Sequence, residues 1–276
     1  MSAEERLRPT FLIVGAQKSG TTAMFRYLAG HPEIVAPEQK ELNFFMCPSV
    51  VALGYDYYHT HFPVKTAENT GKRTFEASPN YLVSAEAPRR MWDYDPNLKL
   101  IILLRDPVKR AHSAWSMYQR FFRKKPDWYF EWMLRCDASV DRGRYLVRPP
   151  TFGESYRADI EQEMEAIAAA RPIEAPFLRH GCYEEQVRAY LDVFPREQVY
   201  IESAERFRAE TAQVLAELLV FLGLSPHQWR DDELQPVFTG DYTTAPPEDC
   251  VELLTSFYRA RNQQLFALLG KEFPWK

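Results

Sequence analysis

The feature that most constrains the fold is a glycine-containing turn between a predicted strand and a predicted helix. The sequence reads TFLIV over residues 10–14 and GAQKSGTT over residues 15–22, and an amphipathic run follows. Gly15 and Gly20 permit backbone angles closed to other residues, so successive N–H groups can point at one anion. The helix N-terminus adds a partial positive charge, and Lys18 adds a full one. This context predicts a phosphate-binding loop.

The loop departs from the Walker A pattern of ATP-binding proteins. The two glycines have the Walker spacing, but Thr21 follows Gly20 where that pattern has lysine, and Lys18 stands two positions earlier. No aspartate at a strand end is an obvious Mg²⁺ ligand. We therefore expect the loop to bind an anion through Lys18 and the hydroxyls of Thr21 and Thr22, and not to serve an ordinary ATPase. A plain strand–helix turn is the alternative.

Elsewhere, β-rich apolar runs alternate with helical stretches, which predicts an α/β fold. We expect three α/β/α layers around a mainly parallel sheet, in a single domain over residues 1–276. Further strands are predicted at 99–104 and 198–202, and long loops near 123–150 and 235–247. Helices are predicted at 22–29, from 107 through 117, and at 154–170, 182–193, 211–222 and 248–269.

The charge balance of the chain indicates which classes of binding partner to expect. The formal net charge is -4 and the isoelectric point is near 5.9, so a basic stripe for nucleic acid is not expected. The longest purely apolar run, residues 100–104, is far short of the ~20 residues that span a bilayer. Residues 1–8 mix acids and bases without the apolar stretch of a signal peptide. These features predict a soluble, cytoplasmic chain.

The cysteines predict no special chemistry. Cys47, Cys136, Cys182 and Cys250 lie far apart, with no CxxC spacing for zinc, and too few for a disulfide scaffold. We expect isolated reduced thiols. His59 and His61, in YHTHF, would point the same way on a strand, but no third metal ligand is evident, so no metal is expected.

At this point the sequence resembles a known family. GAQKSGTT followed by FRYLAGHPEIVAPEQKELNFF is similar to the 5′-phosphosulfate loop of sulfotransferases, enzymes that use 3′-phosphoadenosine 5′-phosphosulfate (PAPS). The heparan-type and related bacterial enzymes are the most similar subgroup. LKLIILLRDPVKRAHSAWSMY resembles their 3′-phosphate segment, and LTSFYRARNQQLFALLGKEFPW their C-terminal helix. The resemblance implies transfer of a sulfuryl group from PAPS to a hydroxyl or amine of a small-molecule or carbohydrate acceptor.

The resemblance also implies which residues hold the two ends of PAPS. The 5′ end falls to Lys18, Ser19, Gly20, Thr21 and Thr22, with Lys18 on the leaving phosphate. Arg105, after the strand at 99–104, and Ser113, in the next helix, match the residues that bind the 3′-phosphate. A guanidinium suits a phosphate because it presents a planar fork of donors. The neighbouring Lys109 and Arg110 are expected to be solvated.

Glu41 is the candidate general base. It precedes Phe44 and Phe45, whose apolar character suggests that the chain enters the core there, which would desolvate the carboxylate and raise its basicity. In the heparan-type enzymes the glutamate at the matching place acts as base. In the cytosolic small-molecule subgroup a histidine does so, which leaves His112, His59 and His61 in reserve.

Some positions depart from the family. Several relatives carry a lysine after the glutamate that matches Glu76, where this chain has Ala77, and some carry an arginine at the position of Thr22. Both departures weigh against a highly sulfated polysaccharide acceptor. In the late loop, residues 239–242 lack the basic residue that relatives use to grip the cofactor. Arg142 or Arg144 would have to substitute.

Two other functions stay open from the residues alone. A P-loop small-molecule kinase would bind ATP with Mg²⁺ and would need an acidic ligand at a strand end, where this chain has Arg105. A non-catalytic nucleotide-binding module would keep the anion site and would tolerate loss of Glu41.

Overall fold

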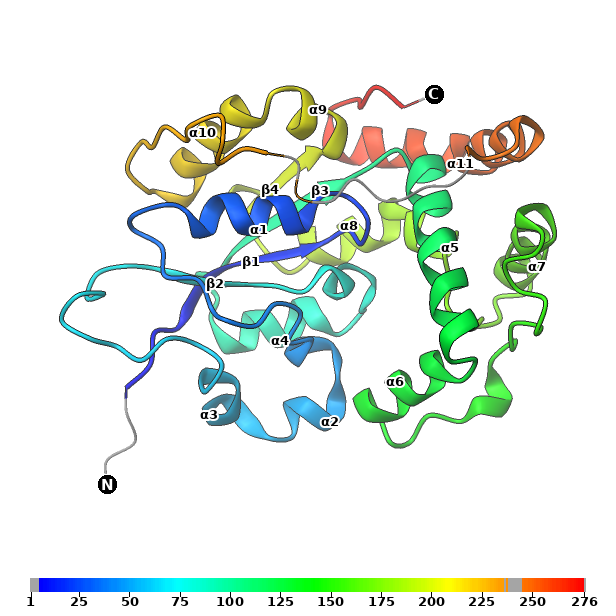
Figure 1. Cartoon of the computed structure of the whole chain (residues 1–276), viewed down its shortest axis with the longest axis horizontal. Helices are drawn as coiled ribbons and strands as arrows, with labels where there is room; N and C mark the ends of the chain where they lie inside the picture. Colours follow the sequence, from blue (N-terminus) through cyan, green and yellow to red (C-terminus); the bar gives the residue numbers. More distant parts are fainter. Residues whose placement is uncertain (1–4, 236, 238–244, 276) are drawn as a thin grey trace. The chain divides into compact units, whose positions relative to one another are not determined.

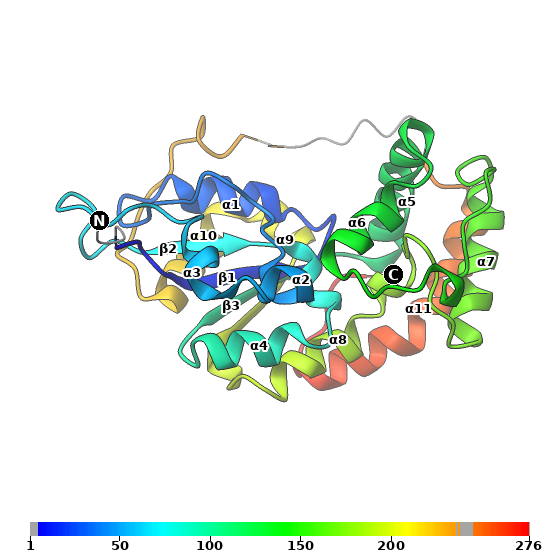
Figure 2. The same cartoon turned by 90° about the horizontal axis from the view of Figure 1, so that it is seen from below.

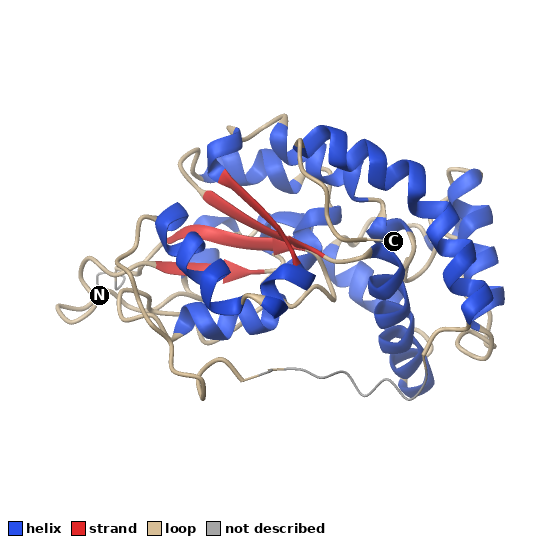
Figure 3. Cartoon of the chain, turned by 90° about the horizontal axis from the view of Figure 1, so that it is seen from above, coloured by secondary structure: helices blue, strands red, loops and turns tan. Residues whose placement is uncertain are grey.

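Four parallel strands form the central sheet, in the order β2-β1-β3-β4 (Figure 3). The computed structural model describes residues 5–235, 237 and 245–275. The strands are β1 (Pro9–Gly15), β2 (Thr74–Ala77), β3 (Lys99–Leu104) and β4 (Val199–Ser203). The α/β fold and the strands expected at 10–14, 99–104 and 198–202 are confirmed, whereas β2 was not predicted.

The α-helices are labelled in Figure 1. They are α1 (Thr21–Ala29), α2 (Pro48–Val51), α3 (Gly54–His59), α4 (Ala87–Tyr94), α5 (Pro107–Lys124), α6 (Trp128–Cys136), α7 (Tyr156–Ala168), α8 (Tyr183–Leu191), α9 (Ala204–Ala209), α10 (Thr211–Leu222) and α11 (Glu248–Leu269). Each predicted helix is present, with bounds within a few residues of those expected. The loop expected near 123–150 is wrong in part, because it contains the end of α5 and all of α6.

The chain divides into two compact units. The first comprises residues 1–104 and 188–239 and contains the sheet. Alternate residues of β1 and β3, such as Phe11, Ile13 and Ile101, pack with Met24 of α1 and Leu218 of α10 in one core. Figure 2 shows α1 and α10 on one face of the sheet and α4 on the other. This layering leaves the turn after β1 at the end of the sheet where β1 meets α1.

The second unit comprises residues 105–187 and 240–276. Asp106 starts α5 as expected, since its carboxylate accepts the N–H groups of Val108 and Lys109 ahead of a helix with Pro107 in its first turn. Residues of α5, α7 and α11 share one core, among them Ala111, Ile160, Cys250, Leu254 and Tyr258.

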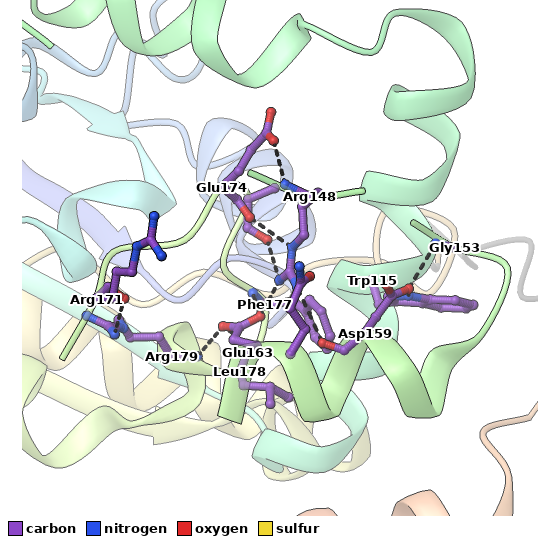
Figure 4. A network of polar contacts seen from close by, with 12 residues as sticks. Trp115, Arg148, Gly153, Asp159, Glu163, Arg171, Glu174, Phe177, Leu178 and Arg179 are labelled. Atoms are coloured by element: carbon purple, nitrogen blue, oxygen red, sulfur yellow. Dashed lines mark hydrogen bonds and ion pairs between the residues drawn. The ribbon is translucent and has the colours of Figure 1, made fainter. Parts of the chain in front are cut away.

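A buried ion pair lies inside this second unit (Figure 4). The Arg148 and Glu163 side chains are 0% exposed and 2.5 Å apart. Glu163 also accepts the backbone N–H groups of Phe177, Leu178 and Arg179, at 2.9, 2.8 and 2.9 Å. Glu163 therefore ties the segment after α7 to that helix.

The cysteines correct one expectation. Cys182 and Cys250 are free thiols, but Cys47 and Cys136 are disulfide-bonded. This was not predicted, because neither cysteine belongs to a spaced cysteine motif. Within the ranges that the structure describes, no helix is long and apolar enough to cross a bilayer.

Candidate functional site

The predicted phosphate loop lies between β1 and α1, as expected. Gly20 takes φ 94°, in the left-handed region, and precedes the first residue of α1. Lys18 also has a left-handed φ, of 70°. Ala16 N–H donates to the Leu103 carbonyl over 2.6 Å, and Ser19 N–H to the Ala16 carbonyl over 3.2 Å. The turn is thus anchored to β3 and folded tightly over its own backbone.

The loop has the properties of an anion site. No side chain caps the N-terminus of α1, and its first turn carries no acidic residue, so its N–H groups and partial positive charge are not offset there. Ser19 is 1% exposed, and its Oγ has no hydrogen-bond partner among the residues that the structure describes. A buried hydroxyl without a partner is costly, which a bound phosphate oxygen would relieve. The residues present therefore fit a 5′-phosphosulfate.

Glu41 lies beside this loop. The two are connected by Lys40, a residue that was not predicted to belong to the site. Lys40 Nζ donates to Thr22 Oγ1 over 3.2 Å and pairs with Glu41 Oε1 over 2.9 Å. One lysine thus links the candidate base to the first turn of α1. The only sequence signal for Lys40 was its place next to Glu41.

The environment of Glu41 differs from the expectation. Phe44 and Phe45 are buried as predicted, but the Glu41 side chain is 51% exposed, so the expected desolvation is wrong for this structure. The chain turns there through a left-handed backbone, with φ 67° at Glu41 and 54° at Asn43. This turn puts the side chain of Glu41 outside while the phenylalanines go in.

Arg105 and Ser113 lie in the second unit. Arg105 directly follows β3, and its carbonyl accepts the Tyr183 hydroxyl over 2.8 Å. Ser113 lies in α5 and is 1% exposed. The assignment of both residues to a 3′-phosphate stays a prediction.

The expectation of a solvated Arg110 is wrong. Its side chain is 0% exposed and its Nη2 donates to the Phe177 carbonyl. An arginine is almost never fully buried, so this position was not expected from the residue type. Lys109 is 63% exposed, as expected.

The reserve histidines lie in different places. His59 ends α3 and contacts the Tyr94 hydroxyl at 3.0 Å, and His61 packs against the Tyr57 ring. The strand expected for both is wrong. His112 lies in α5 against Trp115 and Tyr156, and burial together with Arg105 lowers its pKa.

The remaining predicted features add no further residue to the candidate site. Among the residues described, no group of three or more histidine, cysteine or acidic side chains is placed to hold a metal ion. Residues 239–242 of the late loop lie outside the described part of the chain. Arg142 pairs with Asp127 over 2.9 Å and covers the Phe130 ring, so it is engaged within its own unit.

Comparisons with known proteins show which family this chain resembles. The membrane-associated sulfotransferase kil1 of Dictyostelium discoideum is 26% identical over 97% of this chain and 66% of its own length. The human bifunctional heparan sulfate N-deacetylase/N-sulfotransferase 3 is 31% identical over 95% of this chain. The chain spans only 30% of that human protein.

A solved structure and a family match complete the comparison. The crystal structure of a sulfotransferase from Alicyclobacillus acidocaldarius is 30% identical, with a TM-score of 0.67 over 96% of this chain and 97% of the other. Residues 8–239 match the sulfotransferase domain family, a range that includes the phosphate loop, Glu41, Arg105 and Ser113. The chain belongs to the sulfotransferase domain family, and by family it is a transferase of sulfur-containing groups.

Proposed function

We propose that this chain transfers a sulfuryl group from PAPS to a hydroxyl or amine of a small-molecule or carbohydrate acceptor. The observation that carries the proposal is the link from Glu41 through Lys40 to Thr22. It puts a carboxylate beside the phosphate loop, where an acceptor would meet the sulfuryl group. A binding module would need the loop but not the carboxylate.

The residues divide the work of an in-line transfer. Glu41 takes the proton of the attacking hydroxyl or amine as the new bond to sulfur forms. The bond between sulfur and the 5′-phosphate oxygen breaks, and that oxygen gains negative charge. Lys18 and the N-terminus of α1 stabilise this charge, as cations and oriented dipoles do in phosphoryl transfer. The backbone N–H groups of residues 19–22 and the Ser19 hydroxyl hold the phosphate.

Arg105 and Ser113 complete the proposal at the other end of the nucleotide. A molecule with phosphates on both ends of its ribose needs a second cationic pocket, and a guanidinium fits it. Fixation of the Arg105 carbonyl by Tyr183 and the start of α5 at Asp106 support a defined position for this residue within its unit. No metal has a role in this mechanism.

Calorimetry with the product nucleotide, 3′-phosphoadenosine 5′-phosphate (PAP), tests the binding half. We expect PAP to bind without Mg²⁺ and more tightly than ATP, and Arg105→Ala to weaken PAP far more than the nucleotide without the 3′-phosphate. Tighter binding of ATP with Mg²⁺ would favour a kinase instead. Equal losses of both nucleotides in Arg105→Ala would contradict the 3′-phosphate assignment.

An acceptor screen with labelled sulfate tests the chemistry. On any acceptor found, we expect Glu41→Gln to lower kcat about 10²–10⁴-fold, as for loss of a general base. Lys18→Ala should abolish transfer even at saturating PAPS. Glu38→Gln is the matched control, because Glu38 is exposed on the same segment. A Glu41→Gln enzyme as active as Glu38→Gln would remove Glu41 from the mechanism.

A further inference from the structure

A carboxyl group lies fully buried under the segment that carries Glu41. Glu76 in β2 is 0% exposed and has hydrogen bonds from several donors. The Tyr58 hydroxyl donates to Oε2 over 2.6 Å, and the Tyr81 hydroxyl to Oε1 over 2.8 Å. The Ser78 hydroxyl also donates to this carboxyl. Glu76 is therefore the centre of a polar cluster in an otherwise apolar layer.

Two of these donors are themselves acceptors for the Glu41 segment. Ser78 Oγ accepts the backbone N–H of Asn43 over 3.0 Å, and Tyr81 Oη accepts that of Phe45 over 3.3 Å. The cluster therefore binds the backbone at residues 43 and 45. Glu41 N–H donates to the carbonyl of Ala77, the residue after Glu76, over 3.0 Å.

The segment needs this support because its backbone is strained. Glu41 and Asn43 both take a positive φ, which is a strained conformation for a residue other than glycine. Such a conformation persists only where surrounding contacts impose it. These contacts come from β2 and the turn after it, where the Ser78 and Tyr81 hydroxyls also donate to Glu76.

We propose that Glu76 is a positioning residue for Glu41, acting through Ser78 and Tyr81. The carboxylate accepts all the donors at once and so orients the Ser78 and Tyr81 hydroxyls toward it, which leaves their oxygen lone pairs for Asn43 and Phe45. A neutral amide in its place would turn N–H groups toward some of these donors. The inference rests on the proposed role of Glu41 as base.

Tyr58 provides a matched control inside the same cluster. Its hydroxyl donates to Glu76 as that of Tyr81 does, and both side chains are 0% exposed. No hydrogen bond recorded for the described residues joins the Tyr58 hydroxyl to the backbone at 42–45. Tyr58→Phe therefore weakens the cluster without cutting a link to the Glu41 segment, whereas Tyr81→Phe does both.

The first experiment compares these variants by kcat, melting temperature and PAP affinity. We expect Tyr81→Phe and Ser78→Ala to lower kcat about tenfold or more, with PAP affinity within about twofold of the parent. Tyr58→Phe should lower the melting temperature as much as Tyr81→Phe but keep kcat within about twofold. Equal loss of kcat in Tyr58→Phe and Tyr81→Phe would overturn the proposal, because stability alone would then explain both.

The second experiment is a double-mutant cycle between Glu76→Gln and Glu41→Gln. If Glu76 acts through Glu41, Glu76→Gln lowers kcat at least tenfold in the parent and less than twofold in the Glu41→Gln enzyme. Equal factors in both backgrounds overturn the positioning role and leave the base intact. If Glu41→Gln itself costs nothing, the proposed function fails at its base, and this inference with it. Should Glu76→Gln lose PAP binding through misfolding, Tyr81→Phe takes its place in the cycle.

Discussion

At the residue scale, Gly20 decides whether the phosphate loop can take its shape. Its φ of 94° lies where a side chain is strained, although a Cβ there would meet nothing nearer than Phe207 at 3.8 Å. We expect Gly20→Ala to destabilise the fold by about 1 kcal/mol and to weaken PAP at least tenfold. The strain would be relieved by turning the N–H groups at the start of α1 away from the anion. Urea unfolding and calorimetry measure the two effects.

Gly71 separates the two effects. It has φ 83°, and a Cβ there would have no neighbour within 4 Å. Gly71→Ala should cost a similar free energy of unfolding and leave PAP affinity within about twofold. If both variants weaken PAP alike, the backbone at Gly20 has no special role in binding.

The sequence predicted the residues of the loop but not their setting. Lys18 and the glycines were found because strand, turn and helix follow one another along the chain. The Glu41–Lys40–Thr22 link joins two segments that the pattern treats separately, so no motif contained it. The exposure of Glu41 was predicted wrongly because Phe44 and Phe45 indicate where the chain enters the core. They say nothing about a left-handed turn that reverses the preceding side chain.

At the scale of elements, continuously apolar segments were predicted correctly, whereas segments that mix apolar with polar residues were missed. KLIILL predicted β3 because a strand buried on both faces is continuously apolar. β2 was not predicted because it is short, TFEA, and contains a glutamate. Burial of this glutamate depends on the hydroxyl groups that donate hydrogen bonds to it. α6 was not predicted because its mixture of aromatic and charged residues, with Pro126 just before it, is typical of a loop.

The buried pair between Arg148 and Glu163 of α7 permits a prediction at this scale. Glu163→Gln removes the charge that Arg148 faces at 0% exposure and weakens the acceptor for three backbone N–H groups. Breaking one side of such a pair typically costs about 3–5 kcal/mol. We expect a loss of that order in the free energy of unfolding, measured with urea.

The same helix supplies the control. Glu161 pairs with Arg157, and these side chains are 53% and 44% exposed. Glu161→Gln should change the free energy of unfolding by less than about 1 kcal/mol. If the two glutamine variants lose the same stability, burial does not set the strength of the Arg148 pair.

At the scale of the whole molecule, the residues matched by the family are fewer than those that form the folded core. The match ends at residue 239, yet α11 at 248–269 supplies Leu254 and Tyr258 to the core of the second unit. The Tyr258 hydroxyl donates to the Leu178 carbonyl over 2.7 Å, and a Cβ on Gly181 would meet Tyr258 at 2.9 Å. The unit that carries Arg105 and Ser113 therefore depends on chain beyond the matched domain.

The pH dependence of stability combines contributions of opposite sign from buried histidines and from buried carboxyl groups. Burial lowers the pKa of His112 and His180, so the unfolded chain binds more protons than the native one as the pH falls through about 6.5. Burial raises the pKa of Glu76, Asp159 and Glu174, so the native chain holds their protons longer and stability is favoured on the acid side. The net curve mixes both contributions, and a variant is needed to isolate one group.

His180 is the group to isolate. Burial and the charges of Arg110 and Arg179 lower its pKa from 6.5 to about 3, and within the described part of the chain its buried Nδ1 has no hydrogen-bond partner. Its folded pKa is depressed, so its neutral ring favours folding above pH 6.5 and loses that contribution as the pH falls toward 3. Relative to His180→Gln, the parent should lose up to about 1.4 kcal/mol per pH unit below pH 6.5. Urea unfolding of both proteins at pH 7.5, 6 and 5 measures the difference. The carboxyl groups cancel in this comparison, so a difference that stays constant over this range contradicts the neutral, buried imidazole.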